Sequence, residues 1–495
     1  MPTADHALLP RGSAIDYQKI GLPVGVMIAV LGLTMLVPAV VDLQAGNPNW
    51  PIFVQSALVV AGLGATLALS CLRPLQPLTL RECFALVVAS WLAMSLAGAL
   101  PLMLTAHGLT FTDAFFEAAS ALTTTGSTVM TGLDGLPPGL LLWRSIMQWI
   151  GGLGIIAFGL LLLPFLGIGG LQLFRIESSD TYEKTVARVR VFARRLIAVY
   201  VILTALCVFA YAATGMSAFD AVNHAMTTVS TGGFSTHDAS FGYFNSTPTL
   251  WFAVLFMLAG ALPFSLYVRL FDAYRTNLLD DIQVRTLLAM VAAISLMLVL
   301  WLVLRQHTGL GAALTHAVFN VVSIITTTGY ASTDYLLWGT FPFAMFFVIT
   351  LLGGCTGSTS GGIKTFRLIV GWKIIARLIN KLRFPDGVFP IRCGERIIDN
   401  AVQHSLLAFL TLFLTTLLGV AFALSLTGLD VTTSLSGAAT ALSNVGPGLG
   451  DIIGPSGNFS SLPAPSKWIL ALAMIVGRLE IGAAYVVFMP AFWRV

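Results

Sequence analysis

The feature that most constrains this chain is a series of apolar runs long enough to cross a lipid bilayer. Examples are residues 20–41, 84–104 and 287–304, which contain only isolated polar side chains. A helix needs about 20 predominantly apolar residues to span the hydrocarbon core. Only 10% of the 495 residues are charged, whereas soluble domains carry roughly a quarter. The sequence therefore predicts an integral membrane protein built from α-helices.

Basic residues gather in alternate connecting segments, which predicts the orientation in the membrane. The intervening segments, such as 41–51 and 215–250, contain no Lys or Arg. By the positive-inside rule the basic segments and both termini face the cytoplasm. Each cluster flanks a span, so it indicates no nucleic-acid partner. The clusters are Arg73 and Arg81; Arg175, Lys184, Arg188, Arg190, Arg194 and Arg195; Arg269, Arg275 and Arg285; and Arg367, Lys373, Arg377, Lys381, Arg383, Arg392 and Arg396.

The remaining features of composition exclude several classes of site. Residues 1–19 contain no small-residue cleavage site, so we expect residues 20–41 to be a membrane anchor and not a removable signal peptide. The five cysteines are scattered in or beside apolar runs, a pattern that predicts neither a disulfide framework nor a metal site. No HExxH or nucleophile motif occurs, and we expect no enzymatic activity.

Four segments share one pattern, a moderately apolar stretch followed by a tight glycine turn. They occupy residues 111–128, 219–234, 314–330 and 431–448, close to one hundred residues apart, which indicates an internal repeat. Each stretch is too short and too polar to cross the bilayer and fits a re-entrant helix instead. Aligned on one glycine, the turns read Thr124-Thr125-Gly126, Ser230-Thr231-Gly232, Thr327-Thr328-Gly329 and Asn444-Val445-Gly446.

Each re-entrant segment lies between two apolar runs, so the repeating unit is span, pore helix, turn and span. The paired runs are 81–104 with 140–163, 196–213 with 250–270, 287–304 with 341–352, and 405–426 with 468–489. The predicted fold is an all-α polytopic membrane protein. It has four pseudo-symmetric repeats around one pore, plus two extra N-terminal transmembrane helices. The expected divisions are 1–78 (tail and extra helices), 79–174, 175–276, 277–392 and 393–495.

The turns favour coordination of a dehydrated monovalent cation, most simply K⁺. Irregular backbone at membrane depth is tolerated where it lines an aqueous path, and glycine lets successive carbonyls point the same way. Four such turns would offer rings of carbonyl oxygen in place of the hydration shell. The C-terminal ends of the pore helices would add negative potential. No turn contains Asp or Glu, and the unequal turns predict weaker K⁺/Na⁺ discrimination than four identical strands.

A second candidate site is a glycine-rich interruption of the second span in the third repeat. We expect Gly353, Gly354, Gly357, Ser358, Thr359, Ser360, Gly361 and Gly362, followed by Lys364, to break the helix and form a mobile gating loop. A broken helix without a gating role is the alternative. The segment superficially resembles a phosphate-binding loop, but the Gly-Lys pair and a preceding strand are missing. We therefore expect this chain to bind no nucleotide.

Arg478 lies near the middle of the run 468–489, where an arginine is costly unless it faces water or a partner. Glu480 is only two positions away and lies on a different helix face, so it is not an obvious local partner. Two interpretations remain open. Arg478 is either a positive charge beside the ion path, or one half of a structural ion pair with a neighbouring repeat.

Together these motifs resemble the bacterial Trk potassium-uptake membrane subunit family (TrkH/TrkG), in the superfamily with KtrB and the plant and fungal Trk/HKT transporters. The resemblance spans essentially the whole chain, and the two extra leading spans are similar to TrkH and unlike KtrB. Besides the turns and the loop with Lys364, it rests on Trp149-Ile150-Gly151-Gly152-Leu153-Gly154, Gly477-Arg478-Leu479-Glu480 and Pro490-Ala491-Phe492-Trp493-Arg494.

The resemblance implies K⁺ uptake across the bacterial inner membrane through a channel-like pore with K⁺ bound in its filter. It also implies a homodimer with one pore per protomer, regulated by a cytoplasmic TrkA-like nucleotide-binding ring. Gly126 stands where serine goes with Na⁺ preference in the superfamily, which implies K⁺. The alternative is an H⁺- or Na⁺-coupled K⁺ symporter, for which Glu480 is the foremost candidate acid. The K⁺/Na⁺ ratio, the coupling, the regulatory nucleotide and the dominant gating element stay open.

Overall fold

A computed structural model describes residues 15–73, 78–105, 108–166, 182–270, 277–393 and 396–493. Outside them lie most of the N-terminal tail, the expected divisions at 174/175 and 276/277, and Arg175 and Arg275. The side chains of Lys184, Arg188, Arg190 and Arg396 are also outside the described set. The described elements are almost entirely α-helical, as the sequence predicts.

The helices begin and end as follows: α1 (Tyr17–Thr34), α2 (Leu36–Gln44), α3 (Trp50–Ser70), α4 (Leu80–Leu104), α5 (Phe111–Leu122), α6 (Pro138–Leu166), α7 (Tyr182–Ala213), α8 (Ala218–Val229), α9 (Thr247–Ala261), α10 (Phe264–Leu270), α11 (Ile282–Arg305), α12 (Leu310–Ile325), α13 (Thr340–Thr350), α14 (Thr365–Arg383), α15 (Asn400–Ser425), α16 (Val431–Ser443), α17 (Ala464–Arg478), α18 (Gly482–Phe488) and α19 (Pro490–Trp493). Short 3₁₀ turns are η1 (Leu133–Gly135), η3 (Ser240–Phe244), η4 (Leu278–Asp280) and η5 (Tyr335–Trp338), and strands β1 (Arg392–Cys393) and β2 (Arg396–Ile397) pair antiparallel.

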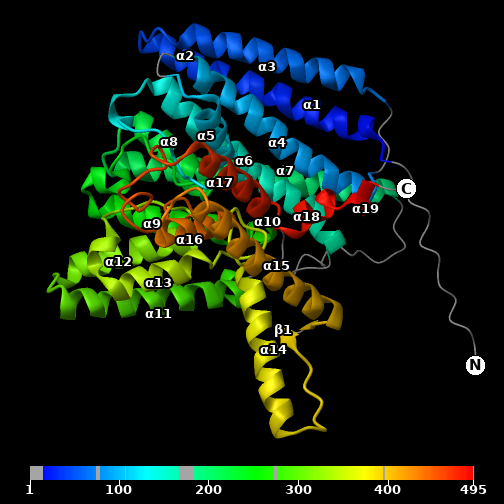
Figure 1. Ribbon diagram of the computed structural model, residues 1–495, viewed down its shortest axis with the longest axis vertical. Helices are drawn as coiled ribbons and strands as arrows, with labels where there is room; N and C mark the ends of the chain where they lie inside the picture. Colours follow the sequence, from blue (N-terminus) through cyan, green and yellow to red (C-terminus); the bar gives the residue numbers. More distant parts are fainter. Residues whose placement is uncertain are drawn as a thin grey trace, which may run out of the picture.

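The four predicted repeats are present as the same packing unit. In each, the first span packs on a pore helix: α4 on α5, α7 on α8, α11 on α12 and α15 on α16. Each pore helix in turn packs on the helix that follows it. The two extra helices, α1 and α3, pack against each other and lie along the outside of the first repeat (Figure 1). The chain is therefore a polytopic bundle of four repeats with two added spans.

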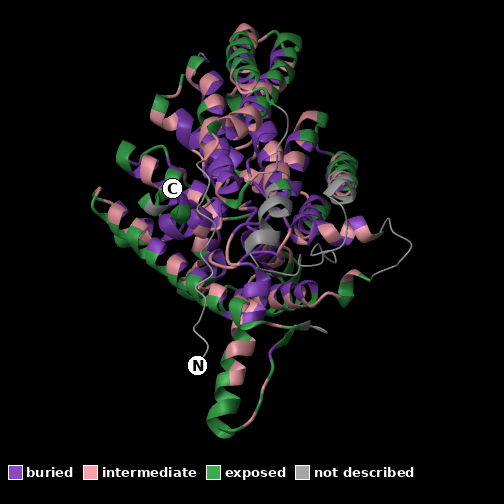
Figure 2. Cartoon of the chain, turned by 90° about the vertical axis from the view of Figure 1, so that its right-hand side faces the viewer, coloured by how far each residue is buried: buried purple, intermediate pink, exposed green. Residues whose placement is uncertain are grey.

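Three of the four pore helices start at side-chain caps, and all four become buried toward their C-terminal ends. Thr110, Ser217 and Asp430 each accept a hydrogen bond from the backbone N–H three residues later, which satisfies one free donor at the start of α5, α8 and α16. Their last turns are almost entirely buried, and Figure 2 shows that buried residues gather in the centre of the bundle. Short, buried helices of this kind agree with the predicted re-entrant segments.

The second spans are broken more often than the sequence analysis expects. The expected span 250–270 is divided into α9 and α10 at Leu262 and Pro263, where proline supplies no N–H. The expected span 468–489 is divided into α17 and α18, which meet at a bend of 112°. Glu480 and Ile481 take positive φ at this bend. Seven described helices are long and apolar enough to cross a membrane, and α17 with α18 is a bent eighth.

The helix that follows the glycine loop leaves the bundle. α14 projects from the body of the molecule and crosses the direction of α3 and α11 (Figure 1). Its lower part and the segment that returns to β1 are exposed in Figure 2. The exposed side chains include Trp372, Ile375, Leu378, Ile379 and Leu382. A helix with this much uncovered apolar surface is typical of an interface.

Candidate functional site: a ring of four glycine turns

The four turns have one backbone conformation. Thr124, Thr231, Thr327 and Asn444 all have φ between 51° and 58°, a left-handed conformation that is rare for residues with a side chain. Two residues later, a glycine with positive φ follows in every turn: Gly126, Gly233, Gly329 and Gly446. The residue between these two donates a backbone hydrogen bond to a carbonyl of its own pore helix. The pairs are Thr125 to Ser120, Gly232 to Thr227, Thr328 to Ser323 and Val445 to Thr440.

This equivalence corrects the second turn by one residue. The sequence alignment pairs Ser230-Thr231-Gly232 with the other turns, whereas the structure aligns Thr231-Gly232-Gly233 with them. Ser230 instead stands at the end of α8, before the left-handed residue. Two adjacent glycines make the register ambiguous in sequence, since either of them can take positive φ. The backbone hydrogen bonds resolve it.

The turns close into a ring through contacts between neighbours. Each positive-φ glycine lies against a backbone oxygen of the next turn: Gly126 against Gly232, Gly233 against Thr328, Gly329 against Val445, and Gly446 against Thr125. A Cβ at any of the four would come closer than 3.0 Å to that oxygen. We call Thr125, Gly232, Thr328 and Val445 the ring residues and the four contacts the seams. Glycine is required at each seam by close backbone approach as well as by φ.

Side-chain hydrogen bonds also cross the seams, and they differ from one seam to the next. Between turns four and one, Asn444 Nδ2 donates to Thr125 Oγ1 at 2.9 Å and Ser127 Oγ donates to Gly446 O at 2.8 Å. Between turns two and three, the Tyr330 hydroxyl lies 2.6 Å from Thr227 Oγ1. The four turns thus share one backbone conformation, but different side chains stabilise each seam.

The seam between turns one and two is held by three polar residues that the sequence analysis missed. Arg144 Nε donates to Glu117 Oε1 at 2.8 Å, and both side chains are fully buried. Arg144 also donates to Ser235 O at 3.2 Å, which ties α5 to the second turn. Gln148, one helical turn further along α6, donates to Gly232 O at 2.6 Å. The sequence signal that could have found these residues is their polar character inside otherwise apolar segments. Glu117 is a fully buried acid beside the ring, whereas the sequence analysis named only Glu480 as a candidate intramembrane acid.

A cavity of about 80 Å³ opens on one side of the ring, and we call it the mouth cavity. All four positive-φ glycines line it, together with Arg144, His237 and Asp238. At its rim, His237 Nδ1 lies 2.5 Å from Asp134 Oδ1 in η1. This hydrogen bond holds the pKa of Asp134 below its ordinary value. The mouth therefore combines backbone oxygens with an ionised carboxylate.

The glycine loop lies against the opposite side of the ring. Ser360 Oγ donates to Thr326 O at 2.7 Å, and the Gly361 N–H donates to Thr327 Oγ1 at 2.7 Å. Thr359 Oγ1 donates to Val229 O at 3.2 Å. The loop therefore occupies the C-terminal ends of α8 and α12, where helix carbonyls lack intrahelical partners.

The other predicted loop residues hold the loop itself in shape. Gly353 N–H donates to Ile363 O at 3.0 Å, so the two ends of the loop run side by side. Gly357 and Gly362 take positive φ. Gly354 approaches the Ser360 side chain, Ser358 Oγ donates to Cys355 O, and Lys364 Nζ donates to Ser360 O.

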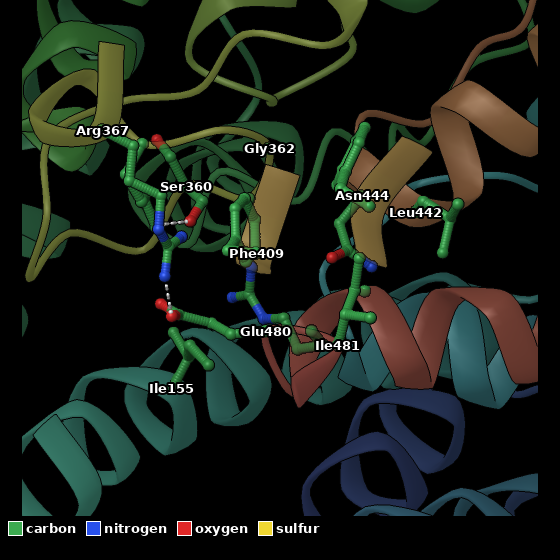
Figure 3. Close-up of a pocket in the computed structure, with 14 residues that line it drawn as sticks. Ile155, Ser360, Gly362, Arg367, Phe409, Leu442, Asn444, Glu480 and Ile481 are labelled. Atoms are coloured by element: carbon green, nitrogen blue, oxygen red, sulfur yellow. Dashed lines mark hydrogen bonds and ion pairs between the residues drawn. The ribbon is translucent and has the colours of Figure 1, made fainter. Parts of the chain in front are cut away.

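A smaller cavity of about 30 Å³ lies between this loop, Asn444 of the fourth turn and the bend after α17 (Figure 3). We call it the sub-ring cavity. Arg367 crosses it and pairs with Glu480 at 2.5 Å. Arg478 also lines the cavity and is only 2% exposed. Its three guanidinium nitrogens have no hydrogen-bond partner among the described residues. Glu480 thus pairs across repeats with Arg367, while Arg478 faces the cavity unpaired.

Among the residues that the structure describes, no group of three or more His, Cys, Asp or Glu side chains could hold a metal ion. The turns contribute backbone carbonyl oxygens and threonine hydroxyls to the ring. Such oxygens replace the water around a monovalent cation in known filters.

Comparison with known proteins gives one consistent result. The family model for TrkH, described as a cation transport protein, matches residues 51–494. The Trk system potassium uptake protein TrkI of Halomonas elongata is 44% identical over 466 residues, covering 94% of each chain. Escherichia coli TrkH is 34% identical, covering 97% of this chain and all of that one. The crystal structure of the potassium transporter TrkH from Vibrio parahaemolyticus superposes with a TM-score of 0.89 at 33% identity, over 97% of this chain and all of that one. The chain therefore belongs to the TrkH family of cation transport proteins.

Proposed function

We propose that this chain takes up K⁺ across the bacterial inner membrane, with the ring of glycine turns as its selectivity filter. The observation that carries the proposal is the closure of the ring by four backbone contacts of one kind. Similarity to potassium uptake proteins over nearly the whole chain supports K⁺ as the ion. By the positive-inside rule, the basic segments lead us to expect both termini in the cytoplasm and the mouth cavity outside.

The filter proposal assigns ion coordination to backbone oxygens and hydroxyls of the turns. The turns comprise Thr124, Thr125, Gly126, Thr231, Gly232, Gly233, Thr327, Thr328, Gly329, Asn444, Val445 and Gly446. Pore-helix C-termini end directly at the ring and add negative potential there. Because the seams are held by different side chains, the ring is less symmetric than a tetrameric filter, and we expect modest discrimination against Na⁺.

The gate proposal assigns occlusion to the glycine loop and to Arg478. The loop hydrogen-bonds directly to the turns and to helix ends beside them, so an ion leaving the ring meets it first. Arg478 places a positive charge in the sub-ring cavity. Movement of α14, which continues the loop, would shift the loop between occluding and open arrangements.

Two partners are proposed. A second copy of the chain would cover the exposed apolar side chains of α14, and a homodimer is the simplest arrangement. A cytoplasmic TrkA-like ring would bind the basic segment after the loop and sense nucleotide. Neutralising Lys381, Arg383 and Arg392 together should weaken binding of that ring and leave basal flux intact. Unchanged binding would place its contact elsewhere.

The decisive experiment measures reversal potentials in proteoliposomes under K⁺, Na⁺ and pH gradients. A channel-like pore follows the K⁺ gradient, whereas an H⁺- or Na⁺-coupled symporter shifts with the coupled ion. Gly329→Ala should raise the Na⁺/K⁺ permeability ratio, because its Cβ would push against Val445 O. Gly215→Ala is the matched control: Gly215 also has positive φ, but no atom of the described residues lies within 4 Å of its Cβ position. Equal ratios in the two variants would overturn the filter assignment.

A further inference from the structure

The four ring residues are not equivalent in their side chains. Thr125, Thr328 and Val445 are β-branched and fully buried, so each fills the space behind its turn. The Oγ1 atoms of Thr125 and Thr328 also bond hydroxyls of their own helix ends, Thr123 and Thr326. The second turn has Gly232 at this position, with another glycine after it. This turn alone would be left with a void behind it and the freedom of two consecutive glycines.

Gln148 occupies the space where a side chain of Gly232 would be. A Cβ at Gly232 would overlap the carboxamide carbon and oxygen of Gln148. The carboxamide bonds both flanks of the turn: Nε2 donates to Gly232 O at 2.6 Å, and Oε1 accepts from the Phe234 N–H at 3.1 Å. Gln148 is fully buried. It therefore supplies volume and hydrogen bonds that the second turn lacks.

The repeats show what normally stands at the position of Gln148. Gly151, Gly260 and Gly477 lie in the second spans of repeats one, two and four. Gly151 lies against Leu122 O, Gly260 against Val229 O and Gly477 against Leu442 O. In each repeat this oxygen belongs to the residue two positions before the one with left-handed φ. The three glycines are thus equivalent, and three residues before them stand Gln148, Met257 and Met474. Both methionines are fully buried.

A compensating exchange follows from this alignment. Repeats two and four combine a buried methionine with a β-branched residue, Thr328 or Thr125, in the turn of the next repeat around the ring. Repeat one combines glutamine with Gly232. Gly232 and the carboxamide of Gln148 on α6 lie in direct contact, so the two differences from the other repeats belong together.

We propose that Gln148 is a specificity-determining positioning residue that fixes the seam between turns one and two and thereby limits Na⁺ entry. The inference rests on the proposed filter function of the ring. Without the carboxamide, Gly232 O and the Phe234 N–H lose their buried partners and the Gly232-Gly233 backbone gains freedom. A seam that can rearrange accommodates the smaller Na⁺ more readily. Gln148 acts through the backbone of the turn, while the turn itself contacts the ion.

The test compares Na⁺/K⁺ permeability ratios of variants in proteoliposomes, with thermal unfolding as a check on folding. Gln148→Ala and Gln148→Met should raise the ratio by roughly tenfold, the effect of losing one or two buried hydrogen bonds. Gly232→Thr alone should also raise the ratio or abolish flux, because its side chain overlaps Gln148.

The double variant Gln148→Met with Gly232→Thr carries the proposal, because it installs the combination found at the equivalent seams. It should return the ratio to within about threefold of wild type, a rescue that general destabilisation would not produce. Gln403→Ala is the matched control. Gln403 is a buried glutamine that donates to Ile398 O at 3.1 Å, away from the ring, and its loss should leave the ratio unchanged.

Two results would overturn the inference: an unchanged ratio in folded Gln148→Ala and Gln148→Met, or a double variant no better than Gly232→Thr alone. Gly329→Ala separates this failure from failure of the filter itself. If Gly329→Ala changes the ratio and the Gln148 variants do not, the ring is the filter and Gln148 does not set its selectivity. If none of them changes the ratio, selectivity resides outside the ring.

Discussion

Replacing Arg478 by glutamine should speed K⁺ permeation while leaving the fold intact. Glutamine retains a polar side chain of similar length and removes only the charge. Arg478 lines the sub-ring cavity together with Asn444 of the fourth turn and Ser360–Gly362 of the loop, so an ion that leaves the proposed filter on this side would pass close to the guanidinium. The perturbation therefore tests one electrostatic barrier.

The size of the effect follows from Coulomb repulsion between two unit charges. At about 6 Å and an effective dielectric near 20, the repulsion is about 3 kcal/mol. A barrier lowered by that amount corresponds to roughly a hundredfold in rate. This is an upper limit, since water and the nearby Glu480 screen the charge. Stability gives a second readout. No described residue pairs with the Arg478 guanidinium, so its neutralisation leaves no orphaned partner and should not lower the unfolding temperature.

The assay is ⁸⁶Rb⁺ or K⁺ uptake into proteoliposomes without any regulatory partner, alongside Arg478→Lys as the charge-conserving control. Arg478→Gln should raise the initial rate, and Arg478→Lys should stay near wild type. A rate equal to wild type in folded Arg478→Gln would refute the barrier. A marked loss of stability would instead show that Arg478 is half of a structural ion pair, the other interpretation that its sequence position allows.

Three further predictions concern the ring, the loop and the ion pair of the sub-ring cavity. Gly126→Ser should raise Na⁺ relative to K⁺ permeation by about tenfold, since φ is +87° and its Cβ would overlap Gly232 O. Gly132→Ser is the control, because Gly132 has φ +67° but no described atom lies within 4 Å of its Cβ position. It should leave the Na⁺/K⁺ permeability ratio unchanged. Deleting residues within 357–362 should raise the K⁺ flux measured without the TrkA-like partner. If the shortened loop conducts like wild type and still responds fully to the partner, the loop is not the gate. Glu480→Gln should lower K⁺ flux by about tenfold, because the carboxylate offsets the cations lining the cavity, and unchanged flux would show that those cations do not face the path.

Much of the fold follows from hydrophobic run length and repetition. The spans and pore helices lie where the apolar runs and glycine turns predict them, because membrane depth limits a helix to a narrow range of lengths. The breaks after α9 and α17 were missed, since apolar composition continues through both. Pro263 was a visible signal for the first. The bend at Glu480 depends on positive φ and on the distant partner Arg367, which local sequence does not reveal.

The sequence identified the residue types of the candidate site correctly, but it aligned the second turn with the other three one residue out of place. Four turns were identified, yet the second was misaligned because Gly232 and Gly233 are locally interchangeable. The contacts that close the ring join residues about one hundred or more positions apart, and no local pattern encodes them. Gln148 and Arg144 escaped notice because they lie within a mostly apolar run, and only the packing shows that both reach the same seam.

The four turns belong to one polypeptide, and this has a consequence for how the proposed filter would change over generations. In a pore assembled from four identical subunits, one codon alters every quadrant at once. Here one codon alters one quadrant, and the other three keep their contacts. Ion preference can therefore drift in small steps through substitutions that would be lethal if they were repeated fourfold. A glycine at position 232, accommodated by a glutamine on a neighbouring helix, is the kind of change that only a single-chain ring can fix in one quadrant.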